Sequence, residues 1–577
     1  MPESAATNTH THAAPHDTRS LRGGFSVFSS GALSLASLRP MAVFAVVPTA
    51  ILVAGLGSWM LFPIVLALTF AVALVFGELA SRFPLEGSVA VWSRQLIGPR
   101  TGWMTAWLYI CAYGILASYV AYSASQKLLV LFGHPAPTSI SIALLCAGIL
   151  LVATLINAVT RGILAVFAIA VGCITVVTCL VVSTMLLVSH RHHGVGALFH
   201  SPAGGSHGWA WATGSLLAAA AAVGVLRGFE MPAEVAEEVR DPERSIPKAI
   251  VWSFVVAAAL VLITSAALFI SYPTSVSSVL DPAGPVQAEL GSVAGHLVGY
   301  LTVLAYLAVV VIAQMAASRT LWISARDREL PASTFFGSLS TKHRLPVRAI
   351  VLVGVGAAVL PFISSADIKQ DLYAAALSAL MIAYLLPVWG ALRARSAGRW
   401  TAGPWSLGRW GTPLLVVALV FTGVTTVNVV WPRVVLYGLG TAQWGPLATI
   451  VVLVAVGLLI GAWSFRDGGT HTRHFGHVEL DLEPSRLLHP GVCIVCFTQL
   501  EADTEIWWDP EAHATSCLHC HELALHVRSN PGADDEALLT MAGHQPSTST
   551  LHRVRDRGWH SDHGTHPRLH WKSNTDK

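Results

Sequence analysis

The sequence predicts an all-α protein that crosses a membrane about twelve times and carries a small soluble segment at its C-terminal end. Of its 577 residues, 54% are hydrophobic and only 12% are charged, and the mean hydropathy is +0.60. Soluble globular domains contain about 25% charged residues, so this composition excludes an ordinary soluble protein. The net charge of +3 is too small to indicate a nucleic-acid partner.

The N-terminal region contains a polar tail and the first two predicted spans. Residues 1–28 show no apolar period, which is typical of a disordered tail, and they lack the basic start and short apolar core of a cleavable signal peptide. Residues 40–77 contain no charge and would measure about 57 Å as one helix, against a hydrocarbon core of about 30 Å. We therefore expect a turn at residues 55–58, between spans at 33–55 and 58–79.

Ten further apolar runs complete a membrane domain over residues 29–465. Each run approaches or exceeds the roughly 20 residues that a helix needs to cross the bilayer. The runs cover residues 103–131, 138–158, 162–188, 208–232, 249–271, 294–323, 347–364, 371–392, 411–431 and 444–464. Lys and Arg concentrate in the loops that follow even-numbered spans. The positive-inside rule therefore predicts a protein of the plasma or inner membrane with both termini in the cytoplasm.

Few ionisable side chains fall inside the predicted spans, and Arg39, Glu78, Arg227 and Glu230 stand out. An arginine at the centre of a membrane helix costs roughly 2.5–3.5 kcal/mol on insertion scales, so it is usually partnered or functional. Residues 225–232 place an arginine, a glycine, a glutamate and a proline directly after an uncharged run, and glycine and proline both weaken a helix. The functional interpretation is a non-helical break that exposes backbone polar groups beside a cavity.

Each of these residues also has a simpler structural interpretation. The sixth span would then end at Leu226, with Arg227 and Glu230 at the membrane surface. Arg39 would be a flank that extends its side chain to the cytoplasmic surface, although a proline follows it and disfavours helix there. For Glu78, at the cytoplasmic end of the second span, a structural cap or ion pair is the favoured interpretation.

Four stretches resemble motifs of amino acid permeases. Residues 77–88 read GELASRFPLEGS and lead into VWSR at 91–94, residues 228–250 begin with Gly-Phe-Glu, residues 325–331 read ARDRELP, and residues 346–350 read PVRAI. In this order on twelve spans, they make residues 25–465 similar to the amino acid–polyamine–organocation superfamily, closest in appearance to its amino acid/choline-type bacterial permeases. The resemblance implies two inverted five-helix repeats followed by two further helices.

The resemblance also implies where a substrate binds. Spans 1 and 6 correspond in the two repeats, and in the family their unwound backbones hold the carboxylate and amine of the substrate. Carried to this sequence, these segments comprise Leu38, Arg39, Pro40, Met41, Ala42, Val225, Leu226, Arg227, Gly228, Phe229 and Glu230. Spans 3, 8 and 10 close the family's pocket, and their polar candidates here are Tyr109, Tyr113, Gln314 and Tyr384. Each of these four has ordinary packing or hydrogen bonding as its alternative.

Two departures from the family pattern concern substrate identity. Residues 38–42 read Leu-Arg-Pro-Met-Ala where a glycine-rich break is common, and Arg227 occupies a position that is usually small or aromatic. Two arginines beside the site disfavour cationic substrates such as polyamines and favour anionic ones. Glu230 offsets one of these charges and is the candidate carrier of a coupled proton.

A cysteine pattern distinguishes the C-terminal segment. After a linker at 466–487, residues 488–530 contain two Cys-x2-Cys pairs, and a His-rich disordered tail at 531–577 follows. The pairs are Cys493 with Cys496 and Cys517 with Cys520. Their spacing is that of a four-thiolate zinc site, so zinc is the predicted cofactor. The alternatives are a redox dithiol, no defined site, or a haem-attachment string at 517–521, which the predicted cytoplasmic location disfavours.

These features predict a transporter and not an enzyme. The leading hypothesis is a secondary active permease that moves amino acids or related small amino compounds by alternating access, coupled to protons through Glu230. The alternative is a permease-like nutrient sensor that signals through the metal-binding tail to a partner that the sequence does not identify. A metal-ion transporter is disfavoured because the spans contain no cluster of His, Asp and Glu ligands.

Overall fold

The computed structural model divides into two compact units, Met1–Ser464 and Phe465–Lys577. The structure describes residues 25–134, 136–159, 161–199, 226–272, 284–327, 329–330, 332–340, 345–363, 366–432 and 443–465. In the C-terminal unit it also describes residues 483–486, 491–492, 499–500, 505–509, 514–517, 520 and 523.

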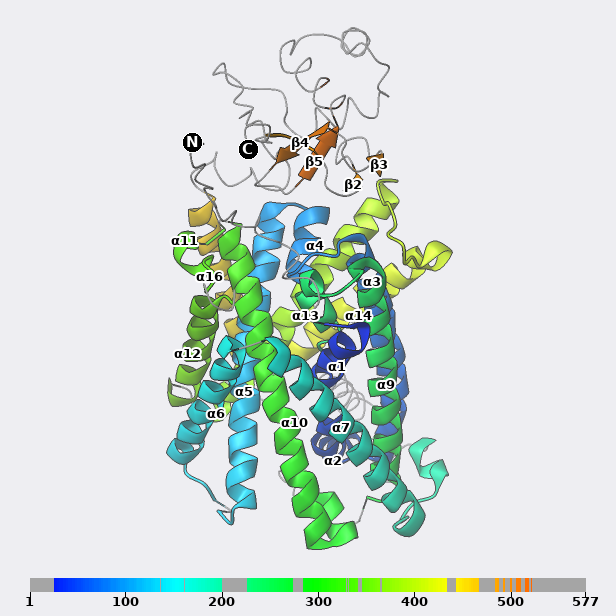
Figure 1. Ribbon diagram of the computed structural model, residues 1–577. Helices are drawn as coiled ribbons and strands as arrows, with labels where there is room; N and C mark the ends of the chain where they lie inside the picture. Colours follow the sequence, from blue (N-terminus) through cyan, green and yellow to red (C-terminus); the bar gives the residue numbers. More distant parts are fainter. Residues whose placement is uncertain are drawn as a thin grey trace, which may run out of the picture. The chain divides into compact units, whose positions relative to one another are not determined.

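The first unit is a bundle of long helices (Figure 1). The helices are α1 (Val27–Ser37), α2 (Val43–Ala54), α3 (Leu61–Arg82), α4 (Ser88–Leu96), α5 (Pro99–Leu131), α6 (Ser139–Val159), α7 (Arg161–Ser189), α9 (Pro242–Ile270), α10 (Gly284–Arg326), α11 (Ser333–Phe336), α12 (Val347–Ile363), α13 (Ala366–Ser396), α14 (Gly411–Val430) and α16 (Gly445–Ser464). Short 3₁₀ helices join them: η2 (Pro40–Ala42), η3 (Leu56–Met60), η4 (Val195–Phe199), η5 (Met231–Glu238) and η6 (Gly408–Trp410). Long apolar runs become helices because a helix satisfies its backbone hydrogen bonds internally, as lipid requires.

Ten helical segments among the described residues are long and apolar enough to cross a membrane, which confirms a multi-pass all-α membrane domain. The predicted ninth span, 347–364, corresponds to the shorter apolar helix Val347–Phe362. Most of the predicted sixth span lies outside the described residues, and only its end is described, from Leu226 onward.

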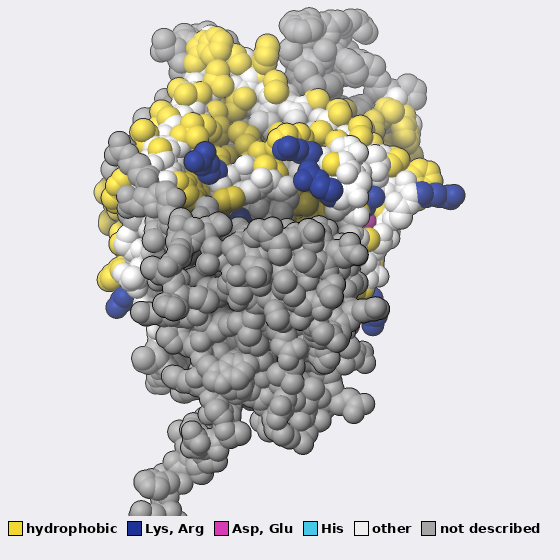
Figure 2. All heavy atoms as spheres, turned by 90° about the horizontal axis from the view of Figure 1, so that it is seen from above, with side chains coloured by type: hydrophobic (Ala, Val, Ile, Leu, Met, Phe, Trp, Pro, Cys, Tyr) yellow, Lys and Arg dark blue, Asp and Glu magenta, His cyan; other side chains and the backbone are white. Residues whose placement is uncertain are grey.

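Helix α5 lies inside the bundle, where it packs against α4, α6, α10 and α13, while α1 packs against α7 and α9. Helices α6, α12 and α16 instead present large exposed hydrophobic side chains such as Leu151, Val355 and Leu459. Figure 2, which views the bundle from one end, shows hydrophobic side chains along much of its visible edge. A surface this apolar is typical of contact with lipid.

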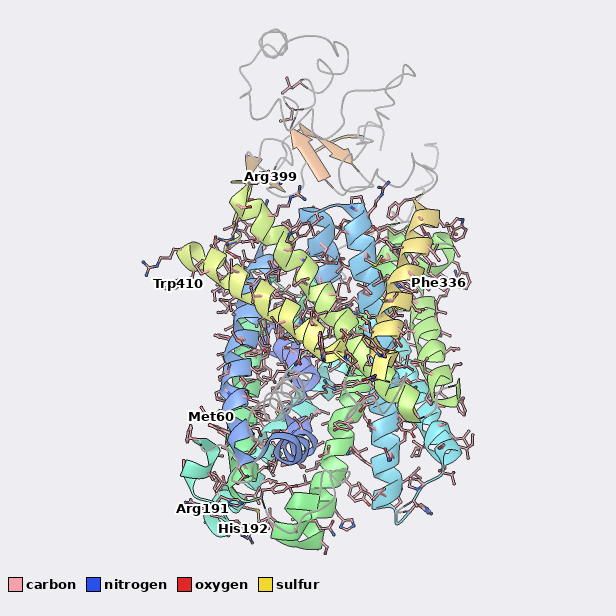
Figure 3. All side chains as sticks on the ribbon, turned by 180° about the vertical axis from the view of Figure 1, so that it is seen from behind. Met60, Arg191, His192, Phe336, Arg399 and Trp410 are labelled. Carbon is pink, nitrogen blue, oxygen red and sulfur yellow. The ribbon has the colours of Figure 1, made fainter. Side chains whose placement is uncertain are left out.

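The two ends of the bundle carry different residues. Met60, Arg191 and His192 lie toward one end, and Phe336 and Arg399 lie toward the other (Figure 3). The second end also carries α4 and α11 in Figure 1 and is called the α4 end. Figure 2 shows Lys and Arg side chains at this end.

The first span is interrupted at Leu38 and Arg39. Helix α1 ends at Ser37, and Arg39 adopts a left-handed backbone with φ 52°, a conformation that costs a residue with a side chain roughly 1–2 kcal/mol. Pro40 begins η2, and α2 resumes at Val43. The predicted break beside Pro40 is therefore confirmed, because proline disfavours helix at the residue before it.

The predicted turn between the first two spans is also confirmed. Gly55 ends α2 with φ 72° and ψ −177°, which glycine adopts without steric cost. The Ser58 hydroxyl donates to the Gly55 carbonyl oxygen at 2.6 Å, and η3 leads into α3. The uncharged stretch thus folds back into two crossing segments.

The second unit contains two small antiparallel sheets among its described residues. In the larger, β1 (Glu483–Arg486) pairs with β4 (Glu505–Asp509), which pairs with β5 (Ala514–Cys517). In the smaller, β2 (Gly491–Val492) pairs with β3 (Gln499–Leu500). Strand β1 lies within the predicted linker 466–487.

Candidate functional site

The two interrupted segments meet at Gly228. This residue has φ 96°, and a Cβ atom built on it would lie 2.0 Å from the Ser37 Oγ atom and 2.7 Å from the Ser37 Cβ atom. Only glycine permits both the left-handed backbone and this close approach. The end of α1 therefore lies directly against the non-helical residues that precede η5.

Replacing Gly228 with alanine is expected to destabilise the bundle strongly, because the new methyl group collides with Ser37 and the positive φ becomes strained. We expect the melting temperature of the detergent-solubilised protein to fall by several degrees, and uptake to fall with it. The matched control is Gly114→Ala inside α5, where nothing lies within 4 Å of the added methyl group and alanine favours the helix. Equal melting temperatures for the two variants would contradict this account of Gly228.

Glu230 lies at the centre of a buried tyrosine cluster. Its Oε1 atom accepts hydrogen bonds from the hydroxyl groups of Tyr109 at 3.0 Å and Tyr113 at 2.6 Å. Its Oε2 atom accepts from the Tyr384 hydroxyl at 2.5 Å. The two α5 tyrosines are four residues apart and so share one helix face. The tyrosine cluster, defined as Tyr109, Tyr113 and Tyr384, thus joins the broken sixth span to α5 and α13.

Phe229 packs against aromatic side chains beside Glu230. Its ring contacts the rings of Phe76 on α3 and Phe254 on α9 edge-on, with centroids 5.3 and 6.0 Å apart, and it also packs against Tyr384 at 5.6 Å. Phe76 in turn contacts Tyr384 at 5.0 Å. Phe229 thus anchors this turn to α3, α9 and α13, while the neighbouring Glu230 carboxylate is hydrogen-bonded to α5 and α13.

Both arginines of the broken segments are buried. Arg227 is 3% exposed, and its Nη1 atom donates to the Leu377 carbonyl oxygen of α13 at 3.3 Å. Arg39 is 8% exposed and lies in electrostatic range of Arg227. Neither arginine extends its side chain to solvent, as a flank at the membrane surface would.

The remaining predicted site residues divide into those at the crossing and those away from it. Leu38, Pro40, Met41, Ala42 and Leu226 are buried beside the breaks, whereas Val225 lies outside the described residues. Gln314 is directed toward α6: its Nε2 atom donates to the Leu150 carbonyl oxygen at 3.3 Å, and its Oε1 atom accepts from Thr154 at 3.3 Å. The structure does not bring Gln314 to the tyrosine cluster.

Sequence reasoning missed a buried charge network at the α4 end. Arg319 on α10 donates to Glu86 at 2.5 Å, contacts the Glu238 carboxylate at 2.9 Å and donates to the Glu234 carbonyl oxygen at 3.2 Å. Glu234 itself accepts from the hydroxyl of Ser88. These contacts connect α10, η5 and the start of α4. The acidic residues of these contacts lie in the motifs at 77–88 and 228–250. In the sequence, these motifs served only to indicate the family.

A second part of the network surrounds Arg94 on α4. Arg94 forms ion pairs with Asp327 and, at 2.6 Å, with Glu329, both just after α10. Burial raises the pKa of Glu329 to about 7, although Arg94 opposes that shift. We call Glu86, Arg94, Glu234, Glu238, Arg319, Asp327 and Glu329 the charge network.

Glu78 forms a structural ion pair at the same end. Both of its carboxylate oxygens accept from Arg395 at 2.5 Å, and Oε1 also accepts from the backbone N–H of Leu407 at 3.1 Å. This carboxylate therefore holds the chain between α13 and η6 against α3.

The N-terminal segment is bonded to the residues that follow η5. The Phe25 N–H donates to the Glu238 carbonyl oxygen at 3.2 Å, and Phe25 forms a parallel β-bridge with Val239. The start of the first span is thus attached to the segment that follows the sixth span, in addition to the contact of Ser37 with Gly228.

The structure does not test the zinc prediction. Cys493 and Cys496 lie outside the described residues, and Cys517 ends β5 while Cys520 is buried. Within the part of the chain that is described, no three His, Cys, Asp or Glu side chains are grouped to hold a metal ion. Zinc in the tail stays a prediction from cysteine spacing.

A multi-pass helical bundle with interrupted spans around a buried polar cluster is characteristic of secondary transporters. The profile of the amino acid permease family matches residues 25–458, and the chain belongs to this family. The resemblance inferred from the four motifs is confirmed, and the family's proteins are transporters and not enzymes.

Individual relatives are distant. The chain is 27% identical over 320 residues to the cationic amino acid transporter 2, vacuolar, of Arabidopsis thaliana. The aligned region covers 52% of this chain and 48% of the relative. It is 27% identical over 367 residues to an uncharacterized transporter of Mycobacterium tuberculosis, covering 60% and 75%. It is 26% identical over 344 residues to an uncharacterized amino-acid permease of Schizosaccharomyces pombe, covering 55% and 61%. The chain spans about half the length of the plant relatives it matches.

Proposed function

We propose that this protein is a secondary active permease that moves amino acids or related small amino compounds across the plasma or inner membrane by alternating access, coupled to protons. The observation that carries the proposal is the Glu230 carboxylate, held by three tyrosine hydroxyls where the two interrupted spans meet. Family membership supports amino acids as the substrate.

The hydrogen bonds of Glu230 explain how a proton would be coupled to movement. An ionised carboxylate only accepts hydrogen bonds, and here it accepts three from α5 and α13. A protonated carboxyl group must donate one, so at least one tyrosine hydroxyl has to change from donor to acceptor. Protonation therefore keeps the cluster bonded but replaces charge-assisted hydrogen bonds with neutral ones, which are about half as strong. The contact of the sixth span with α5 or α13 weakens, the kind of change that an alternating-access cycle requires.

The α4 end supports the proposed orientation and one half of the access cycle. Lys and Arg side chains lie at this end (Figure 2), which agrees with a cytoplasmic location and with both termini on that side. The buried charge network joins α4, η5 and α10 there, so the proposed path from the site to the cytoplasm is closed in this conformation.

Purified protein in liposomes tests the proposal directly. We expect labelled amino acids to accumulate when the outside is made acidic relative to the inside, and the accumulation to collapse when a protonophore removes the gradient. Uptake or exchange of none of a full amino acid panel would overturn the permease assignment. Accumulation that is unaffected by the pH gradient would overturn proton coupling alone.

Removing the C-terminal unit and measuring uptake in the same assay tests the nutrient-sensor alternative. Removing residues 466–577 leaves the helical unit complete, so we expect uptake to persist. Uptake that persists while a transport-independent cellular response is lost would favour signalling through the tail.

A further inference from the structure

The two broken segments together carry more positive than negative charge. Residues 38–42 contribute Arg39, and residues 226–230 contribute Arg227 and Glu230. Gly228 lies against Ser37. Arg227 directly precedes Gly228 on one segment, and Arg39 is two positions after Ser37 on the other. The two guanidinium groups therefore arise from facing backbone segments at one crossing.

Backbone strain indicates that the Arg39 side chain has a role. Arg39 has φ 52°, a conformation that glycine adopts without penalty. A strained residue persists only where the surrounding structure requires its conformation, and such residues cluster at functional sites. Arg39 is also buried, so its charge acts inside the protein.

Tyrosine side chains lie near Arg39, at a level of α5 farther from the α4 end than Tyr113. Tyr119 and Tyr373 stack with ring centroids 4.1 Å apart, and Arg39 is in electrostatic range of Tyr119 and Tyr306. Tyr119 follows Tyr113 by six residues of α5, about 9 Å along the helix axis toward the opposite end. A small, mostly apolar pocket that Arg39 and Arg227 do not line borders Tyr119; its lining is Ile115, Ser118, Tyr119, Tyr122, Leu360, Pro361 and Leu372.

Both guanidinium groups lie in electrostatic range of these tyrosines, Arg39 of Tyr119 and Arg227 of Tyr373. A guanidinium matches a carboxylate with two parallel hydrogen bonds, whereas a cationic side chain at this position is repelled by both arginines.

We propose that Arg39 and Arg227 bind the side-chain carboxylate of the substrate, so that the protein prefers acidic amino acids to neutral and cationic ones. This inference rests on the proposed permease function and names its substrate class. It separates this chain from what the names of its plant relatives state, which is cationic amino acid transport.

Competition for uptake tests the inference without any variant. Glutamate and glutamine have nearly the same shape and differ in side-chain charge, as do aspartate and asparagine. In liposomes, we expect glutamate or aspartate to be taken up at least tenfold better than the matching amide, and lysine and arginine not to compete. A preference for the amides or for lysine would overturn the inference while leaving the permease assignment intact. Uptake of no amino acid would overturn the permease assignment itself.

A variant of Arg227 shows which carboxylate the arginine binds. If Arg227 binds the side-chain carboxylate, Arg227→Gln lowers the glutamate-to-glutamine uptake ratio at least tenfold, and Arg227→Lys restores part of it. If the arginine instead binds the α-carboxylate, uptake of both amino acids falls equally and the inference is wrong. The matched control is Arg191→Gln, an exposed arginine at the end opposite α4 (Figure 3), which should leave the ratio unchanged.

Discussion

Replacing Glu230 with glutamine will reduce proton-driven amino acid accumulation by about 100-fold, the scale on which removal of a proton-transferring group typically acts. Glutamine has the same shape, and its amide oxygen still accepts from Tyr109 and Tyr113. Its amide nitrogen can donate to the Tyr384 oxygen, so the tyrosine cluster remains bonded. The variant therefore loses the proton without losing the packing.

Comparing two transport modes isolates this effect. Accumulation under an acid-outside gradient should be lost in Glu230→Gln, while exchange of labelled for unlabelled substrate without a gradient should stay measurable. Glu243→Gln is the matched control, because Glu243 is exposed in the first turn of α9. Normal gradient-driven accumulation by Glu230→Gln would mean that another group carries the proton.

Replacing Arg319 with glutamine will open the α4 end. Arg319 is the cation between the carboxylates of Glu86 and Glu238, and removing one partner from a buried ion pair typically costs about 3–5 kcal/mol. A cost of that size changes the equilibrium constant between the closed and open forms by more than 100-fold in favour of the open form. Ser93 is fully buried on α4, so we expect a cysteine placed there to react much faster with a charged thiol reagent in the Arg319→Gln protein.

Arg399→Gln serves as the control for this experiment, since Arg399 is exposed at the same end (Figure 3). It should leave the labelling rate of the cysteine at position 93 unchanged, and Arg319→Lys should give an intermediate rate. Equal labelling in Arg319→Gln and the unaltered protein would show that the charge network does not hold this end closed.

Glu86 should make closure of the α4 end depend on pH. Burial raises the pKa of Glu86 from its ordinary 4.5 to about 7, with Glu237 and Glu238 raising it further and Arg319 and Arg326 opposing the shift. In an open form, Glu86 would be hydrated and its pKa would return toward 4.5. Between about pH 4.5 and 7, Glu86 is therefore protonated in the closed form and ionised in the open form. Closure is favoured at the acidic side of this window and weakens as the pH rises toward 7. We expect labelling of Ser93→Cys to increase across this range, and Glu86→Gln to abolish the increase.

Much of the fold was predictable because lipid restricts the chain to few options. The uncharged stretch over 40–77 had to fold back, since one helix of that length exceeds the bilayer, and the structure turns at Gly55. The break beside Pro40 followed from proline chemistry. That Tyr109 and Tyr113 face the same site was also predictable, because a four-residue spacing places both on one face of α5.

The charge network was not predictable by the same reasoning. Arg94 and Asp327 are 233 positions apart, as are Arg319 and Glu86, and no local rule pairs residues across such a distance. Gln314 illustrates the related limit for α10: its depth in the span agreed with a site residue, but helix packing directs it toward α6. Depth follows from sequence, whereas rotation about the helix axis follows from packing.

The attachment of the first span to the sixth span and to the segment after it has a consequence for energetics. Phe25 is bonded to Glu238, and Ser37 lies against Gly228, so two separated contacts prevent either span from pivoting on the other. The binding residues they carry would then keep the same mutual geometry whichever side of the membrane the site faces. A difference in affinity between the two sides would therefore have to come from groups outside these two spans, such as the tyrosine cluster on α5 and α13.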